Sequence, residues 1–201
     1  MNEKFFDLKK EKQDRMINAA LKVFALKGYQ HASTDDIVAE AGISKGLLFH
    51  YFQNKLGLYS FLFDYSVRFM LLELSTCGGK DEDDFFELWK RMEGAKLLVL
   101  KNYPYMQEFI DSTRYEDVKE ALYATESKKG ALEELRDEIL SHADLSRFRP
   151  EMDVERVKVM LNYTIRGILN ESFREGTFHP NMMQTEINAY VQMLKNVAYH
   201  L

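Results

Sequence analysis

The sequence predicts an all-α protein with a short N-terminal three-helix unit, residues 1–55, and a larger C-terminal helical domain, residues 56–201. Only three of the 201 residues are proline, and long segments are rich in Leu, Lys, Glu and Met. Apolar residues recur at helical rather than alternating spacing. With 46% hydrophobic residues the chain can bury a sizeable core, and about nine helices can be delimited along it.

The first helix is expected from about residue 9 to residue 27. Its buried stripe consists of Ile17, Ala20, Leu21 and Phe24, which recur at helical spacing. Gly28 should end this helix, and Tyr29 begins the connection to the next two. Three helices around one small core are the least that would make such a unit stable.

Residues 34–55 are typical of two short helices joined by a tight turn. Thr34 is the expected N-cap of the first helix, because its hydroxyl can accept a hydrogen bond from a free backbone N–H. Gly42 ends that helix as a glycine at this position commonly does. Ser44 caps the second helix, which is expected over residues 45–52.

The second short helix has two unlike faces. Leu48 and Phe52 are four residues apart and point together toward a core. The rest of its surface is aromatic, basic or as small as Gly46, which suits entry into a nucleic-acid groove better than contact with water alone. For each of these residues taken singly, an ordinary surface or capping role is the alternative. The surface residues are Lys45, Gly46, Leu47, Phe49, His50 and Tyr51.

Helix 4, expected over residues 55–74, is apolar nearly all round, which is typical of a helix buried between others. The segment GGKDEDD, residues 78–84, is expected to be a solvated break. Pro104 interrupts the chain between helix 5 (residues 84–102) and helix 6 (residues 105–111). Gly176 and Pro180 mark the end of helix 8 (residues 153–175). Helix 7 is expected either whole or in two pieces around Gly130. Helices 5 to 9 are expected over residues 84–102, 105–111, 116–141, 153–175 and 182–199.

The formal net charge of −5 argues against a general nucleic-acid binder, but the charge is unevenly distributed. Residues 1–60 carry nine Lys or Arg and seven Asp or Glu, whereas the remainder carries 18 and 25. This asymmetry indicates different partners for the two parts, or it arises by chance. The single Cys77 cannot form an internal disulfide, which fits a reducing compartment. With no signal peptide or membrane-spanning run, we expect a cytoplasmic protein without a membrane partner.

No pattern in the sequence indicates an enzyme. There is no glycine-rich phosphate loop and no nucleophile elbow, and the five histidines are scattered without metal-ligand spacing. The many carboxylates occur in solvated runs such as DEDD. We therefore expect neither a metal nor a cofactor.

The run from residue 17 to residue 58 resembles the DNA-binding domain of the TetR family of bacterial transcriptional regulators. The resemblance covers roughly the first third of the chain. It departs from the family where Leu47 replaces a frequent Thr, Phe49 a frequent Tyr, and Leu56 a frequent Glu; the first two changes remove hydroxyls that could bond DNA. The matching residues are Ala20, Phe24, Gly28, Tyr29, Thr34, Ile37, Ala39, Ala41, Gly42, Ile43, Ser44, Lys45, Gly46, Leu48, Phe49, His50, Tyr51, Phe52, Lys55 and Leu58.

The resemblance implies that the second short helix lies in the major groove of double-stranded DNA. Gly46 would let the backbone approach closely, Leu47 could touch a thymine methyl, and Lys55 could bind a phosphate. Phe5 and Phe6, ahead of the first helix, would either pack back on the domain or lie along DNA as an arm. The expected DNA-binding residues are Thr34, Lys45, Gly46, Leu47, Phe49, His50, Tyr51 and Lys55.

In the family the C-terminal helices form a ligand cavity, and the last two long helices pair with those of a second subunit. The resemblance therefore implies a homodimer through helices 8 and 9 (residues 153–175 and 182–199), a palindromic operator and a small-molecule effector of unknown identity. Arg166 could serve the ligand, the dimer or an internal ion pair. The candidate ligand-binding residues are Tyr59, Phe63, Trp89, Met92, Tyr123, Tyr163 and Arg166, although such aromatic stripes are more often plain core.

The leading hypothesis is a sequence-specific DNA-binding transcriptional regulator, most often a repressor in this family, that a ligand releases from DNA. The alternative is a helical small-molecule or partner-binding module that no longer reads DNA. The missing hydroxyls at Leu47 and Phe49 favour this alternative. A steep loss of DNA affinity with rising salt would distinguish the two hypotheses.

Overall fold

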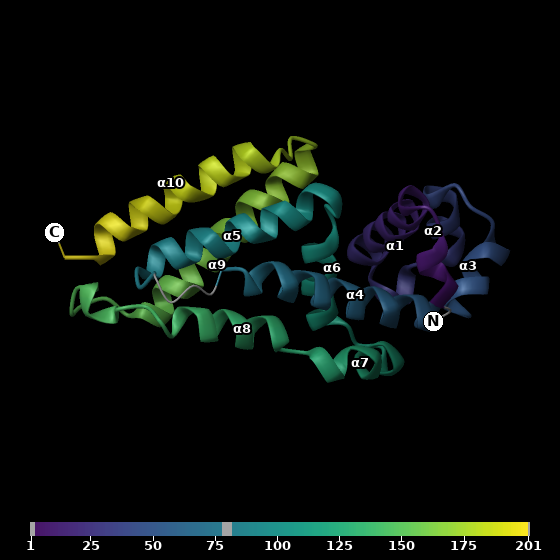
Figure 1. Cartoon of the computed structure of the whole chain (residues 1–201), viewed down its shortest axis with the longest axis horizontal. Coiled ribbons are helices and arrows are strands. Elements are labelled where there is room, and N and C mark those ends of the chain that lie inside the picture. The colour runs from purple at the N-terminus through teal and green to yellow at the C-terminus, as the bar shows by residue number, and fades with distance from the viewer. Residues whose placement is uncertain (1–2, 78–81, 201) are drawn as a thin grey trace. The chain divides into compact units, whose positions relative to one another are not determined.

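The computed structural model describes residues 3–77 and 82–200, and in this part of the chain every regular element is a helix (Figure 1). The predicted all-α fold is therefore confirmed. The α-helices are α1 (Lys10–His31), α2 (Thr34–Ala41), α3 (Lys45–Phe52), α4 (Lys55–Ser75), α5 (Phe85–Asn102), α6 (Met106–Ser112), α7 (Lys119–Thr125), α8 (Ala131–Leu140), α9 (Val154–Glu175) and α10 (Pro180–Ala198). The 3-10 helices are η1 (Glu3–Asp7), η2 (Thr113–Tyr115), η3 (Glu126–Lys128) and η4 (Leu145–Arg147).

The chain packs into two compact units. The first unit comprises Met1–Leu71 and Asn102–Leu132, and the second comprises Leu72–Lys101 and Glu133–Leu201. The first unit thus contains the three N-terminal helices and also the later segment with α6, η2, α7 and η3. The division between residues 55 and 56, which the sequence analysis places between a DNA-binding part and a ligand-binding and dimerisation part, stays a prediction.

Local signals in the N-terminal part act largely as expected, with one correction. Gly28 has a φ of 66°, which breaks the helical path of α1, although one more turn continues to His31. The N-cap of α2 is Ser33 rather than Thr34, and its hydroxyl accepts a hydrogen bond of 3.0 Å from the N–H of Asp36. Ser33 has the extended backbone that an N-cap requires, whereas Thr34 is already the first helical residue.

In the C-terminal helices the structure decides between two expectations at Gly130 and differs from expectation at Pro180. Gly130, with a φ of 89°, separates α7 and η3 from α8, so the two-piece interpretation of helix 7 is the one observed. Pro180 does not merely follow the end of a helix but begins α10, where the N–H that proline lacks would have no helical partner. Residues 78–81 of the expected GGKDEDD break lie outside the described residues.

An aromatic cluster joins the N-terminal turn η1 to α3 and α4. Phe5 is fully buried, and its ring centroid lies 5.0 to 5.6 Å from those of Tyr51, Phe52 and Phe61. The amide of Gln13 fixes the same segment by donating to the carbonyl oxygen of Phe6 at 3.0 Å. The N-terminal aromatic residues therefore pack back on the domain through Phe5 and do not form an extended arm.

A second aromatic cluster joins α6 to the N-terminal helices. Tyr59 on α4 lies 5.1 Å from Phe24 on α1 and 5.3 Å from Phe109 on α6, measured between ring centroids. All three rings are buried. This apolar contact makes α6 part of the same core as α1 and α4.

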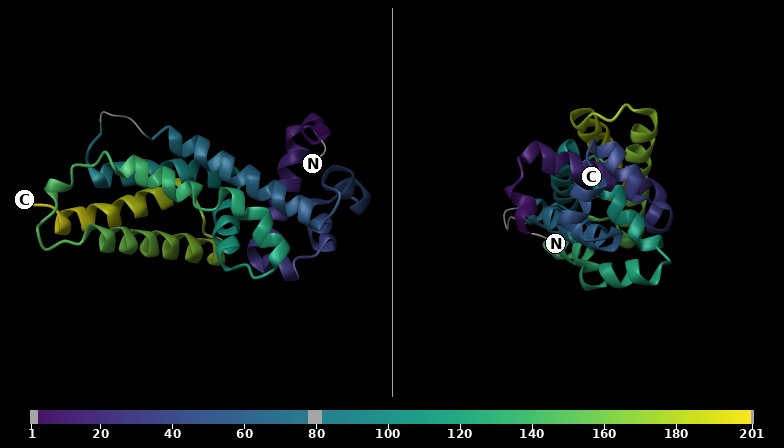
Figure 2. Two further views of the ribbon diagram at one scale, coloured as in Figure 1. Left: turned by 90° about the horizontal axis from the view of Figure 1, so that it is seen from below. Right: turned by 90° about the vertical axis from the view of Figure 1, so that its right-hand side faces the viewer.

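In the second unit, α9 and α10 run side by side in opposite directions (Figures 1 and 2). Asp153 caps α9 through hydrogen bonds from the N–H groups of Glu155 and Arg156. Both helices bury only one stripe, and their outward faces remain exposed. The buried apolar residues are Val157, Leu161, Ile165 and Leu169 on α9, and Ile187, Val191 and Ala198 on α10.

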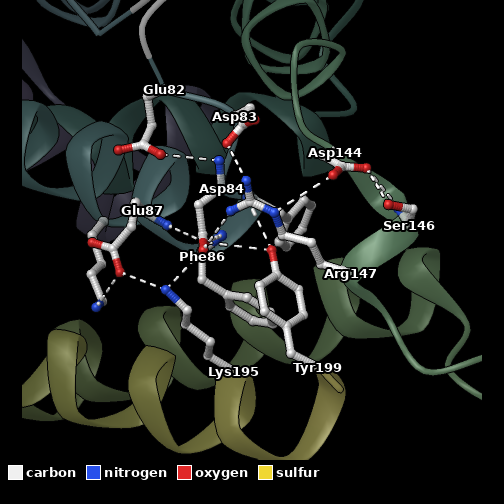
Figure 3. Close-up of polar contacts among 12 residues, drawn as sticks. Glu82, Asp83, Asp84, Phe86, Glu87, Asp144, Ser146, Arg147, Lys195 and Tyr199 are labelled. Carbon is white, nitrogen blue, oxygen red and sulfur yellow. Dashed lines mark hydrogen bonds and ion pairs between the residues drawn. The ribbon is translucent and has the colours of Figure 1, made fainter. Parts of the chain in front are cut away.

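A charged network holds the start of α5 against the end of α10 within the second unit (Figure 3). Asp84 is buried and accepts hydrogen bonds from the N–H groups of Phe86 and Glu87, so it caps α5. Its carboxylate also lies 2.8 Å from the ammonium of Lys195 and 3.3 Å from the guanidinium of Arg147. Burial alone would raise the pKa of Asp84, but these bonds together lower it below its usual value.

We expect Asp84→Asn to destabilise the protein by about 2–3 kcal/mol at pH 7, because it removes a charge-assisted network and leaves Lys195 partly unpaired. Since the pKa of Asp84 is lowered on folding, its contribution is present above the unfolded-state pKa and is lost as pH falls through the folded-state pKa. The stability difference between wild type and variant, from urea unfolding, should therefore shrink below about pH 4.

Asp83→Asn is the matched control, since Asp83 also contacts Arg147 but is largely exposed. It should cost under about 1 kcal/mol at any pH. A stability difference for Asp84→Asn that stays constant down to pH 3 would contradict the role given to its carboxylate.

Candidate nucleic-acid interface

The helices α2 and α3 are short, and side-chain caps and one left-handed glycine define their ends. Gly42, at φ 62° and ψ 43°, turns the chain after α2 and donates its N–H to carbonyls of the last turn. Ser44 then caps α3 by accepting a hydrogen bond of 3.3 Å from the N–H of Leu47. Ile37, Leu48 and Phe52 face the core and are almost fully buried. The sequence thus places α3 with one face buried and the other outward.

The outward face of α3 presents Lys45, Gly46 and His50, all exposed, and the partly exposed Leu47 and Phe49. A Cβ added to Gly46 would meet no atom of the described residues within 4 Å. The packing of this part of the chain therefore does not require glycine at position 46. These five predicted residues lie together on one helix of two turns, as expected.

The acidic residues of α2 are each paired with a lysine of α1 or α3, which the sequence analysis did not anticipate. Asp35 binds Lys45 at 2.9 Å, Asp36 binds Lys27 at 2.9 Å, and Glu40 binds Lys22 at 2.7 Å. Hydrogen bonds from Ser33 and Lys27 lower the pKa of Asp36. Carboxylates near the outward face of α3 are thus locally neutralised, which reduces their repulsion of a polyanion.

Two predicted phosphate-binding residues are engaged inside the protein. Tyr51 is only 7% exposed and packs its ring on Phe5. The ammonium of Lys55 donates to the carbonyl oxygens of Tyr29 and Ala32, at 2.9 and 3.2 Å. Thr34, the remaining predicted contact, is partly exposed at the start of α2. A phosphate-binding role for these residues stays a prediction.

The predicted ligand-binding residues are divided between the two units and differ in burial. Tyr59, Phe63 and Tyr123 belong to the first unit, and Trp89, Met92, Tyr163 and Arg166 belong to the second. Tyr59, Phe63, Trp89 and Met92 are buried, Arg166 is partly exposed, and Tyr123 and Tyr163 are 87% and 69% exposed. The first four have the burial expected of cavity or core residues, and the two exposed tyrosines do not.

The described residues also bear on metal-ligand clusters, on membrane-spanning helices and on the single cysteine. They contain no group of three or more His, Cys, Asp or Glu side chains that could hold a metal ion. None of the helices in this part of the chain combines the length and apolarity needed to cross a bilayer. Cys77 is buried, its thiol donates to the carbonyl oxygen of Arg91, and burial raises the pKa of that thiol.

The helix α3 buries one face and exposes the other, and it follows a capped partner helix across a left-handed glycine. This arrangement defines a protein of the helix-turn-helix class. The family model for "Bacterial regulatory proteins, tetR family" matches residues 16–60, which include α2, α3 and the start of α4. Over residues 16–60 the chain is thus similar to the DNA-binding domain of the TetR family of bacterial transcriptional regulators. Members of this family are regulators rather than enzymes.

A curated relative is similar to this chain over a short stretch. An uncharacterized HTH-type transcriptional regulator of Bacillus subtilis (strain 168), YuxN, is 43% identical over 56 residues, which are 28% of this chain and 19% of that protein. The match thus spans only about a fifth of the relative's length.

Solved structures share the fold of the whole chain at low sequence identity. A TetR family transcriptional regulator from Chloroflexus aurantiacus J-10-FL has a TM-score of 0.66 at 19% identity, covering 100% of this chain and 99% of that one. The ketosteroid transcriptional regulator KstR2 of Mycobacterium tuberculosis has a TM-score of 0.68 at 16% identity, covering 96% of this chain and 97% of that one.

We expect Gly46→Ala to stabilise the protein by up to about 0.5 kcal/mol, because alanine favours a helix and the added methyl meets no neighbour. The same methyl should weaken DNA binding about tenfold, the size of one lost contact in a specific interface. Thermal unfolding and fluorescence anisotropy on a selected DNA site measure the two effects. Raised stability with unchanged affinity would show that DNA does not approach the backbone at Gly46.

Proposed function

We propose that this protein is a dimeric, sequence-specific DNA-binding transcriptional repressor whose affinity for its operator is modulated by a small molecule. The observation that carries the proposal is the outward face of α3, where Lys45, Gly46 and His50 are exposed on a helix whose other face is buried. A helix held in this way can enter a major groove without disturbing its own core. A cytoplasmic location follows from this function.

The contacts divide into base readout and phosphate binding. His50 would donate to a base edge, and Leu47 would supply an apolar contact of the kind that favours a thymine methyl. Lys45 would exchange its ion pair with Asp35 for a phosphate; both partners are exposed, so this exchange costs little. The other predicted contacts would position α3 on the sugar-phosphate backbone of DNA; they are Thr34, Gly46, Phe49, Tyr51 and Lys55.

The test is selection of binding sites from a random DNA pool, followed by affinity measurements at several salt concentrations. We expect a palindromic site and a steep loss of affinity with salt. His50→Ala should cost about 1–3 kcal/mol and relax specificity at one position in each half-site, and Lys45→Ala should lower the salt slope by about one per subunit.

Lys129→Ala, which removes an exposed lysine outside α3, is the control and should leave affinity nearly unchanged. If no sequence is enriched and binding at low salt is absent, the second hypothesis, a helical binding module that no longer reads DNA, replaces the first.

We place the dimer interface of this proposal on α9 and α10. Seven large apolar side chains are exposed there, and within each helix some recur at intervals of three and four residues, as on one helical face. Gly167 lies on the exposed side of α9 with open space beside it, which would allow a partner helix to approach closely. The seven residues are Val159, Met160, Tyr163, Met182, Tyr190, Met193 and Val197.

Two arginines in this face should separate the subunits. In the variant Tyr163→Arg with Met193→Arg, each guanidinium would be buried without a partner at the interface, at a cost of several kcal/mol. Size-exclusion chromatography with light scattering should give a monomer with wild-type helix content, and affinity for a palindrome should fall.

Leu98→Arg is the matched control, because Leu98 is equally exposed on α5 of the same unit. It should remain a dimer. A wild-type protein that is monomeric at micromolar concentration, or a double variant that stays dimeric, would exclude this interface.

The buried ligand candidates Trp89 and Met92 support an effector site in the second unit. The indole N–H of Trp89 is buried and finds no acceptor among the described residues, and such a donor costs about 1–3 kcal/mol unless a ligand or water supplies one. The guanidinium of Arg136 lies 5.7 Å from the centre of the Trp89 ring. An effector that favours one state of the protein by about 1–3 kcal/mol would change operator affinity roughly 5- to 150-fold.

A further inference from the structure

Tyr29, near the end of α1, contacts two other segments of the first unit through its backbone N–H, its backbone carbonyl, its hydroxyl and its ring. Its N–H donates to a carboxylate oxygen of Glu116 at 2.9 Å, and its hydroxyl donates to Glu120 at 2.5 Å. Its carbonyl accepts from Lys55, whose ammonium also lies 4.3 Å from the centre of its ring. Tyr29 therefore joins the end of α1 to the start of α4 and to the η2–α7 segment.

This junction lies directly before the two short helices. Lys55 also binds the carbonyl oxygen of Ala32, and the next residue, Ser33, is the N-cap of α2. Glu116 uses its second carboxylate oxygen to accept from the N–H groups of Asp117 and Val118, ahead of α7. A displacement of this carboxylate would thus act on the backbone that leads into α2.

A second polar junction lies near the other end of α1. The buried Tyr103 donates its hydroxyl proton to Asp14 at 2.7 Å and accepts from Lys10 at 2.8 Å. The hydroxyl of Tyr65 on α4 lies 2.9 Å from that of Tyr103, and burial and the hydrogen bonds with Tyr65 and Asp14 raise the pKa of Tyr103. The amide of Asn18 donates to the carbonyl of Asn102 at 3.0 Å.

The third attachment involves α4. Lys128 of η3 forms an ion pair with Asp64, in addition to the apolar contact of Phe109 with Tyr59. The segment 102–132 is thus tied to both ends of α1 and to α4, although 70 residues of sequence separate it from α1. Polar bonds at separated points, together with a shared aromatic core, resist both translation and rotation of this segment.

We define the reading head as α1–α3. We propose that residues 102–132 belong to the compact unit that carries the reading helix α3, and that Glu116 and Glu120 are positioning residues for the reading head. Any event that displaces η2 or α7 then moves the entry into α2, and with it α3. Neither an operator nor a ligand is needed to test this role, so its failure is distinguishable from failure of the proposed DNA-binding function.

Hydrogen exchange followed by mass spectrometry on the full-length protein tests the proposal. In Glu116→Ala with Glu120→Ala, amide exchange should rise about tenfold over residues 113–125 and also over residues 34–52, because the lost bonds are to charged acceptors. Exchange over α9 should not change. The rise in exchange over residues 34–52 distinguishes positioning of the reading head from a merely local structural role.

The matched control is Glu126→Ala, which removes an exposed carboxylate from the same segment and should leave both regions unchanged. If exchange rises over 113–125 while residues 34–52 stay as protected as in wild type, the proposal is overturned. A rise of equal size in the Glu126 control would also overturn it.

If the double variant does not fold, Glu120→Ala and Tyr29→Phe each remove one hydrogen bond only and keep the proposal falsifiable. Each should raise exchange over residues 34–52 about threefold, and the two together should do no more than either alone. Protection of residues 34–52 that is unchanged in both single variants would equally reject the positioning role.

Discussion

The burial of one face of α3 against aromatic rings is the constraint on which the interface depends. Phe52 on α3, Phe61 on α4 and Phe5 from the N-terminal turn pack with centroids between 5.0 and 5.4 Å apart. Such ring pairs add to the free energy of burial because their edges and faces attract one another. A helix of eight residues would not be stable alone in water. Because this cluster fixes α3 from inside, its outer side chains are not needed for folding.

The negative charges near that interface are neutralised by ion pairs rather than outweighed by an excess of basic residues. The protein as a whole is acidic, and the first 60 residues are only slightly basic. Within α2, however, all three carboxylates contact lysines from neighbouring helices. Exposed pairs of this kind contribute little to stability, but they remove uncompensated negative charge from the approach of a polyanion. Net charge alone is therefore a poor guide to what this surface binds.

The parts of the fold that the sequence predicted are those coded by local chemistry. Gly42 and Ser44 determine the turn and the start of α3 through backbone conformation and a side-chain cap, and the spacing of Leu48 and Phe52 determines its inward face. The shift of the α2 cap from Thr34 to Ser33 is a local ambiguity between two residues that can both cap.

Long-range pairing could not be predicted from one sequence. Nothing near Lys55 indicates that its ammonium would bind the carbonyls of Tyr29 and Ala32, and nothing near Glu116 or Glu120 indicates a contact with Tyr29. The same limit explains the candidate ligand residues. Helical spacing indicates that Trp89 and Tyr163 each lie on a helix, but only the packing of the folded chain leaves the first buried and the second exposed.

The single tryptophan of the chain, Trp89, is fully buried in the second unit, whereas the aromatic clusters of the first unit consist of phenylalanine and tyrosine. Indole emission excited at long wavelength therefore reports on the second unit alone, while far-ultraviolet circular dichroism reports on helices of both. In a denaturant titration the two signals would coincide if the protein melts as one cooperative block, and they would separate if each unit melts at its own midpoint. The native sequence thus carries an optical label for one half of the molecule.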